Sequence, residues 1–160
     1  MNVNIICIGK LKEAYWREAV AEYAKRIGGY ASFKVLELAE VKLPENPSES
    51  QILQGLTEEA KKILPYLEQK SAYNIALCIE GKQVDSPKLA EIFKTATLNG
   101  NSTINFVIGS SFGMADSVKN ACHFKLSFSP MTFPHQLARV IACEQIYRAI
   151  SIINNTKYHK

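Results

Sequence analysis

The feature that most constrains the fold of this chain is the alternation of short apolar runs with longer segments of helical periodicity. Apolar runs of strand length occupy residues 3–8, 33–38, 74–79, 103–108 and 125–128. Strands that are apolar on both faces are typical of parallel sheets with helices on both sides. The sequence therefore predicts an α/β fold with a mainly parallel sheet.

Helical patterns separate these runs and follow the last one. They cover residues 13–27, about 51–64, 86 to about 100, a short segment ending near 121, and 135–153. Pro65 is expected to end or kink the second helix near Leu64, because proline lacks the amide N–H that an inner turn needs. Ser86 and Pro87 provide an N-cap and a first-position proline for the third helix. The length of 160 residues predicts one domain over residues 1–160.

Composition argues against a membrane span, a secreted protein and a metal site. No apolar stretch approaches the roughly 18 residues of a membrane-spanning helix. The first residues lack the basic segment and cleavage site of a signal peptide, which predicts a cytoplasmic protein. The four cysteines, Cys7, Cys78, Cys122 and Cys143, have no CxxC spacing, so we expect reduced thiols and no bound metal.

The net charge of +4 is unevenly placed along the chain. From residue 119 onward the sequence has six basic residues and one acidic residue, Glu144. The basic residues are Lys119, Lys125, Arg139, Arg148, Lys157 and Lys160. A solvated basic face would explain this bias, but a polyanionic partner such as nucleic acid explains it as well.

Two prolines shape the segment between the last predicted strand and the last helix. The residue before a proline is biased away from helical backbone, so Ser129 and Phe133 should be extended and the loop around Pro130 and Pro134 rigid. A rigid, uncharged loop offers backbone N–H and C=O groups beside apolar side chains. Such a surface suits a flat heterocycle such as adenine better than a phosphate.

The last helix is apolar on more than one stripe, which burial within one subunit or in a dimer explains equally well. A glycine-bounded loop, Gly109 to Gly113, follows the fourth predicted strand, and strand ends are where open parallel sheets bind ligands. The loop lacks the spacing of a dinucleotide-binding fingerprint. Its glycines are therefore expected to be turn residues on spacing alone.

These segments resemble the ribosomal RNA large subunit methyltransferase H family of the SPOUT superfamily. The resemblance rests on the run from Leu126 to Arg139, the Gly109–Gly113 loop, Leu77, and the terminal Tyr158-His159. It implies a SPOUT α/β fold with a C-terminal trefoil knot and a homodimer built on the last helix. It also implies methyl transfer from S-adenosylmethionine to N3 of a pseudouridine in 23S rRNA of the assembled ribosome. The family has two adjacent glycines after the fourth strand, and Ser110 replaces the second.

The resemblance also suggests site residues. Those expected to bind the cofactor are Leu77, Gly109, Phe128, Ser129, Pro130, Met131, Thr132 and Phe133. Methyl transfer to N3 requires a group that accepts the imide proton and groups that stabilise the developing anion. Candidates for these catalytic tasks are Arg139, His159 and Lys160, with Tyr158 beside them and His135 as a second candidate for the proton.

Two rival functions remain open from the sequence. A SPOUT methyltransferase acting on tRNA or on a ribose would share the cofactor loop but not the terminal Tyr-His. A non-catalytic ribosome-binding module would have no affinity for S-adenosylmethionine. The chain itself does not decide whether the tail serves its own subunit or its partner.

Overall fold

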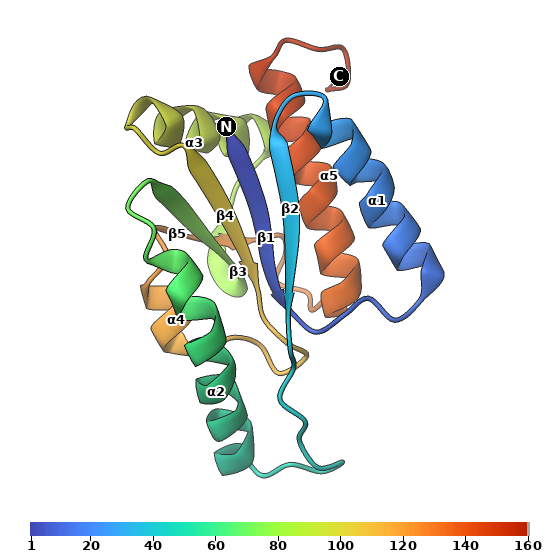
Figure 1. Ribbon diagram of the computed structural model, residues 1–160, viewed down its shortest axis with the longest axis vertical. Helices are drawn as coiled ribbons and strands as arrows, with labels where there is room; N and C mark the ends of the chain where they lie inside the picture. The colour runs from blue at the N-terminus through green and yellow to red at the C-terminus, as the bar shows by residue number, and fades with distance from the viewer. Residues whose placement is uncertain (160) are drawn as a thin grey trace.

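A computed structural model describes residues 1–159 as a parallel sheet between two layers of helices (Figure 1). The strands are β1 (Asn2–Ile8), β2 (Ser32–Leu38), β3 (Ala72–Gln83), β4 (Thr103–Ile108) and β5 (Phe124–Ser127). Their order across the sheet is β2-β1-β4-β3-β5, and every neighbouring pair is parallel. The α/β fold predicted from the apolar runs is confirmed.

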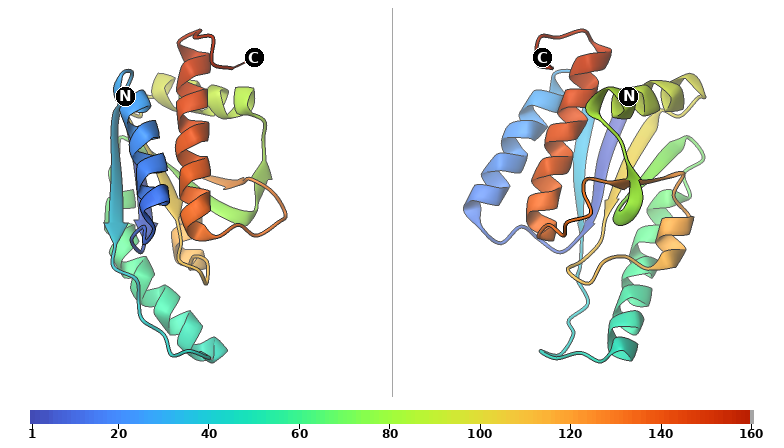
Figure 2. Two further views of the ribbon diagram at one scale, coloured as in Figure 1. Left: turned by 90° about the vertical axis from the view of Figure 1, so that its right-hand side faces the viewer. Right: turned by 180° about the vertical axis from the view of Figure 1, so that it is seen from behind.

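The helices divide between the two faces of this sheet. They are α1 (Ala14–Gly28), α2 (Glu49–Leu67), α3 (Ser86–Leu98), α4 (Asp116–Asn120) and α5 (His135–Ile153). α1, α3 and α5 cover one face, while α2 and α4 cover the other (Figures 1 and 2). This double cover explains why β4, the central strand, is buried along its whole length.

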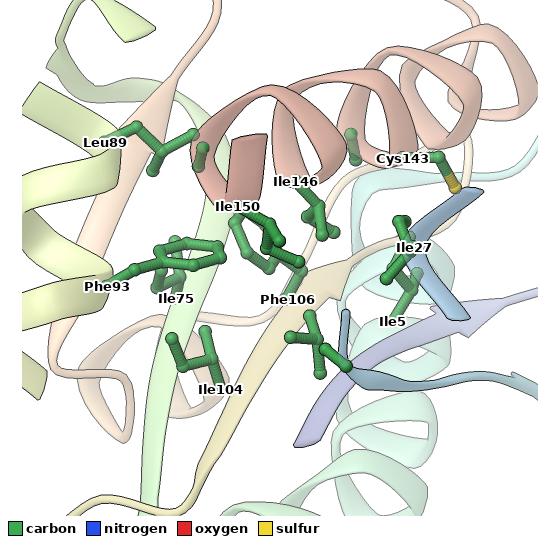
Figure 3. Close-up of a cluster of buried hydrophobic side chains, with 14 of the residues drawn as sticks. Ile5, Ile27, Ile75, Leu89, Phe93, Ile104, Phe106, Cys143, Ile146 and Ile150 are labelled. Atoms are coloured by element: carbon green, nitrogen blue, oxygen red, sulfur yellow. The ribbon is translucent and has the colours of Figure 1, made fainter. Parts of the chain in front are cut away.

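The larger hydrophobic core lies between the sheet and α1, α3 and α5 (Figure 3). Phe93 and Phe106 pack there with ring centroids 5.8 Å apart. Ile146 and Ile150 of α5 are 0% and 1% exposed within the same core. Burial inside one subunit therefore explains a large part of the apolar character of the last helix.

A row of asparagines, of which Asn74 and Asn105 are buried and Asn4 is half-buried, fixes the register of the three inner strands on the other face. Asn4 of β1, Asn105 of β4 and Asn74 of β3 lie opposite one another in the sheet. The Asn4 amide donates to Asn105 Oδ1 at 2.9 Å, and the Asn105 amide donates to Asn74 Oδ1 at 2.9 Å. A one-residue slip would break this row and leave buried amides unpaired, so it disfavours other registers.

Two helix boundaries differ from the predicted ones. α2 was expected to end or kink near Leu64, and it does not end there, because it continues past Pro65 to Leu67. Pro65 lies in the last turn, where its missing N–H costs one hydrogen bond, and the buried Leu67 packs into the core. The N-cap of α3 is Asp85, whose side chain accepts from Lys88 N, rather than Ser86.

The far end of β3 crosses the β5 segment at very short range. The two strands pair in two stretches with a register shift between Leu77 and Lys82. A Cβ atom on Gly81 would lie 2.6 Å from the Leu126 carbonyl carbon, so only glycine allows this approach. Beyond the crossing, the chain turns into the loop that leads to α5 (Figure 2). The trefoil knot implied by the resemblance stays a prediction, since these contacts establish the crossing and not the threading.

Candidate functional site: a cavity at the ends of three parallel strands

The carboxyl ends of β3, β4 and β5 meet at the edge of the sheet where open parallel sheets bind ligands. A cavity of about 900 Å³ lies there. It is lined by residues 77–80 of β3, residues 108–116 at and after the end of β4, and residues 127–135 except Pro130. Its volume is near the top of the roughly 300–1,000 Å³ range of small-molecule sites. The cavity can therefore hold a cofactor-sized ligand and part of a second reactant.

The structure brings the predicted cofactor residues together from three separate segments. The residues that line the cavity are Leu77, Gly109, Phe128, Ser129, Met131, Thr132 and Phe133. Pro130 is the exception, because it is exposed and does not line the cavity. Pro130 instead restricts the backbone between Ser129 and Met131.

Local hydrogen bonds hold the proline loop in shape. The Ser127 hydroxyl donates to the Ser129 carbonyl at 3.1 Å, and Met131 N donates to the Ser129 hydroxyl at 3.1 Å. All peptide bonds in residues 1–159 are trans. The loop is thus rigid for two reasons, the prolines expected from the sequence and a serine pair that the sequence did not reveal.

The glycine loop is closed on itself rather than open to a ligand at Gly109. A Cβ atom on Gly109 would lie 2.0 Å from the Gly113 carbonyl oxygen. Gly113 has φ +97°, and its N–H donates to the Ser110 carbonyl at 2.9 Å. Gly109 is therefore required by the turn itself, as its spacing suggests, and the turn presents Ser111 and Phe112 to the cavity.

His135 is the catalytic candidate that the structure places at the cavity. It is the first residue of α5, follows the N-cap residue Pro134 and lines the cavity wall. Burial lowers the pKa of His135 below its ordinary value of 6.5, as do the nearby charges of Arg139 and Lys12, while Glu40 opposes the shift. The imidazole is therefore neutral at pH 7 and able to accept a proton.

Arg139 is located behind the cavity and not on its surface. Its side chain is 0% exposed, and its Nη1 donates to Glu37 Oε1 at 2.7 Å. Nη2 donates to the Gly9 carbonyl at 3.0 Å. Arg139 is absent from the cavity lining, so the expectation that its guanidinium contacts the target base is not met within this subunit. In the sequence, a basic residue on an apolar helix suggested a functional site. In the structure, Arg139 instead connects α5 to the ends of β1 and β2.

The terminal residues are docked on α5 away from the cavity of their own chain. The Tyr158 hydroxyl donates to Glu144 Oε1 at 3.2 Å, and the Tyr158 ring packs edge-on against Tyr147 at 4.7 Å. His159 Nδ1 lies 3.4 Å from Arg148 Nη1. Neither Tyr158 nor His159 lines the cavity, and the tail lies at the opposite end of α5 from the proline loop (Figure 2). The remaining candidate, Lys160, falls outside the described residues.

The basic bias of the sequence does not become one basic face. Lys119 is paired with Glu80 at 2.5 Å and with Asp116 at 3.5 Å, at the edge of the cavity. Arg139 is buried, and Arg148 is paired with Glu144 at 2.6 Å. Much of the excess positive charge is therefore paired with acidic side chains of the same subunit.

The cysteines are poor nucleophiles, and the described part of the chain holds no cluster of metal ligands. Burial raises the pKa of Cys7, Cys122 and Cys143 to about 12, and all four cysteines are free thiols. Within residues 1–159 no three His, Cys, Asp or Glu side chains gather as metal ligands would. Among the helices of the described chain, none has both the length and the apolar character needed to cross a membrane.

Comparison with known proteins agrees with this site. Residues 1–159 match a family described as predicted SPOUT methyltransferase. The "Ribosomal RNA large subunit methyltransferase H" of Clostridium novyi is 47% identical over 160 residues, which is 100% of both chains. The protein of the same name from Bacillus pumilus is 44% identical over the same full length. The chain belongs to the ribosomal RNA large subunit methyltransferase H family.

A solved structure supports the fold of this methyltransferase H chain. A probable methyltransferase from Bordetella pertussis superposes with a TM-score of 0.56. The superposition includes 93% of this chain and 94% of the Bordetella chain. The two sequences are 13% identical, so this likeness concerns the fold alone. The SPOUT resemblance drawn from the motifs is confirmed.

Some residues of the methyltransferase cavity were not predicted from the sequence. Leu53 and Leu56 of α2 form a wall of the cavity, and Phe112 lies at the glycine loop beside them. Leu56 fits the core register of α2, while Leu53 lies off that register and is 66% exposed. An exposed leucine beside the apolar stripe was the one available signal, and it is too common on helices to identify a site.

We predict that Gly109→Ala weakens S-adenosylmethionine binding at least tenfold, about 1.4 kcal/mol. The new Cβ would collide with the Gly113 carbonyl oxygen at 2.0 Å and force the turn to open. Calorimetric titration measures the effect. Gly28→Ala is the matched control, because a Cβ there meets no atom within 4 Å. Equal affinity of Gly109→Ala and wild type would contradict this account of the turn.

Proposed function

We propose that this chain, as a single SPOUT unit over residues 1–160, transfers a methyl group from S-adenosylmethionine to N3 of a pseudouridine in 23S rRNA. The observation that carries the proposal is the convergence of Leu77, the glycine loop and the proline loop on one cavity. The full-length similarity to curated methyltransferase H proteins points to the same reaction. Its proposed substrate, the ribosome, places the enzyme in the cytoplasm.

The residues of the cavity suit the cofactor. Leu77, Phe128 and Phe133 provide apolar side chains that can cover an adenine, and the rigid proline loop provides backbone polar groups. Glu80, Asp116 and Lys119 lie among the lining residues. When bound, S-adenosylmethionine supplies a methyl group that is already electrophilic. The task left to the protein is to align the base and to handle one proton.

The chain's own residues can perform these tasks with no covalent intermediate. The neutral His135 imidazole at the cavity wall can accept the N3 proton as the nitrogen is methylated. Cationic groups on the terminal residues would stabilise the charge on the base carbonyls. No thiolate is needed, because N3 is itself the nucleophile.

We propose a homodimer built on α5. Leu137 and Ile141 are partly exposed on this helix and belong to neither hydrophobic core. α1 and α3 pack against α5 and leave this stripe of two residues partly exposed, so a partner can reach it. A second copy of the chain is the occupant that the resemblance implies. A two-fold axis through the stripe would pair identical residues of the two subunits.

The position of the tail favours action on the partner's cavity. α5 has 19 residues and is therefore about 28 Å long. The cavity includes His135 and Ala138 at the start of this helix, while residues 154–159 follow its far end. A two-fold axis across α5 that sets the helices in opposite directions would bring the tail of one subunit towards the cavity of the other.

We predict that the protein methylates assembled ribosomes in vitro when the rRNA comes from cells that lack it. Mass mapping of the rRNA should find one added methyl group on a pseudouridine, at N3. Calorimetry with S-adenosylmethionine in the absence of ribosomes provides the second measurement.

Each rival function gives a different result in this experiment. Methylation of tRNA or of a ribose would support another SPOUT activity and contradict the proposed target. Absence of both cofactor binding and methylation would indicate a non-catalytic ribosome-binding module. Cofactor binding with no methylation of any ribosomal particle would also contradict the proposed reaction.

We predict that Ile141→Asp converts the dimer to a monomer while the subunit stays folded. A carboxylate on the proposed interface would lose water without gaining a partner, which is costly. Sedimentation gives the mass, and circular dichroism reports folding. Ile146→Asp cannot serve, because Ile146 is 0% exposed and its loss would unfold the subunit.

The control for the dimer prediction is Tyr66→Asp. Tyr66 is 43% exposed on α2, on the other face of the sheet, so this change should leave the oligomeric state unaltered. A dimer of unchanged affinity after Ile141→Asp would argue that the subunits meet elsewhere.

A further inference from the structure

Glu59 is a buried acidic residue that the reaction described above does not use. It lies on α2, where its side chain is one of the few buried charged groups, with 5% of the residue exposed. Burying a carboxylate is costly unless hydrogen bonds replace the lost water. Each of its two oxygens has such a bond. Oε1 accepts from Val41 N at 3.1 Å, and Oε2 accepts from the Ser110 hydroxyl at 2.8 Å.

The two partners of Glu59 belong to different segments of the chain, and one of them lines the cavity. Ser110 is the second residue of the glycine loop and itself lines the cavity. Val41 lies in the extended connection between β2 and α2. Glu59 therefore joins α2, the glycine loop and this connection at one buried point. A glycine at position 110 would have no hydroxyl to offer to this carboxylate.

Three contacts hold the connection between β2 and α2 along one face of α2. A Cβ atom on Gly55 would lie 3.1 Å from Leu43 Cδ2, which shows how closely Leu43 packs there. Glu59 binds Val41 N, and Lys62 Nζ donates to the Ala39 carbonyl at 2.7 Å. Positions 55, 59 and 62 are spaced by four and three residues, so they share one side of the helix.

This arrangement controls the geometry of the cavity, because α2 and the glycine loop are two of its walls. α2 contributes Leu53 and Leu56, and the loop contributes residues 109–113. The Ser110–Glu59 hydrogen bond is the side-chain contact that fixes the loop to the helix. Hydrogen bonds to a carboxylate are stronger than those between neutral groups, and burial shields this one from water.

We infer that Glu59 is a positioning residue for cofactor binding, which acts through Ser110 by holding the glycine loop against α2. This inference rests on the proposed function, since it concerns the same cavity. Glu59 does not line the cavity and touches neither reactant in this arrangement. Its loss should loosen the loop and reduce affinity for S-adenosylmethionine rather than remove a catalytic group.

The test compares four single variants of the full chain. Glu59→Leu removes both hydrogen bonds, and Ser110→Ala removes one. Glu59→Gln can keep both, because its amide oxygen can accept from Val41 N while its amide N–H donates to the Ser110 hydroxyl oxygen. Glu58→Leu is the matched control, since Glu58 is an exposed neighbour paired with Lys61 at 2.6 Å on the surface.

Two measurements are made on each variant at a temperature well below its Tm. Hydrogen exchange of the protein without cofactor should be faster at residues 39–44 and 109–115 in Glu59→Leu, but only at residues 109–115 in Ser110→Ala. Calorimetric titration with S-adenosylmethionine should show a Kd raised about tenfold or more in both. Glu59→Gln and Glu58→Leu should resemble wild type in both measurements.

A purely structural role would give a different pattern. A lower Tm in Glu59→Leu and Ser110→Ala with an unchanged Kd would overturn the inference. If Glu59→Leu fails to fold, Ser110→Ala decides through both measurements together, because Ser110 itself lines the cavity. A raised Kd without faster exchange at residues 109–115 would then overturn the inference. If wild type itself does not bind S-adenosylmethionine, the proposed function fails and the cofactor role of Glu59 falls with it. The exchange pattern would still show whether Glu59 joins the two segments.

Discussion

The arrangement of the site depends on one buried guanidinium. Arg139, in the second turn of α5, is 0% exposed and binds Glu37 near the end of β2 together with the Gly9 carbonyl after β1. These contacts fix the start of α5 against the carboxyl edge of the sheet. The proline loop runs from the end of β5 to the start of α5. Both of its ends are therefore held in place, one by the sheet and the other by the contacts of Arg139. Loss of Glu37 would leave this buried guanidinium with an unpaired donor, which is costly.

From that fixed point the cavity follows from the topology of a parallel sheet. Parallel strands bring their carboxyl ends, and the loops after them, to one edge. Here β3 contributes residues 77–80 of the strand itself, β4 and β5 contribute the loops that follow them, and α2 closes the side with Leu53 and Leu56. Both loops are rigid for local reasons, a serine pair in one and a turn between Gly109 and Gly113 in the other. Methyl transfer needs little more than such alignment, because the reactive group arrives with the cofactor.

The sequence predicted those parts of the fold that depend on local patterns. The apolar runs gave the strands to within a few residues, and α5 begins and ends where its periodicity indicates. The cofactor residues were predicted through the family resemblance, since spacing alone indicated only turn glycines at Gly109 and Gly113. Arg139 could not be assigned from the sequence, since its partner Glu37 is 102 residues away and no local pattern relates the two. Glu59 and Ser110 are 51 residues apart and were missed for the same reason.

We propose that one active site combines the cavity of one subunit with the tail of the other. Mixed dimers test it most directly. One subunit lacks Tyr158, His159 and Lys160, and the other carries Gly109→Val with an intact tail. Each parent alone should fail to methylate assembled ribosomes, while the mixture should regain activity, because its heterodimer has one intact cavity facing one intact tail. An inactive mixture, with heterodimers demonstrated by native mass spectrometry, would contradict the account and assign each tail to its own subunit.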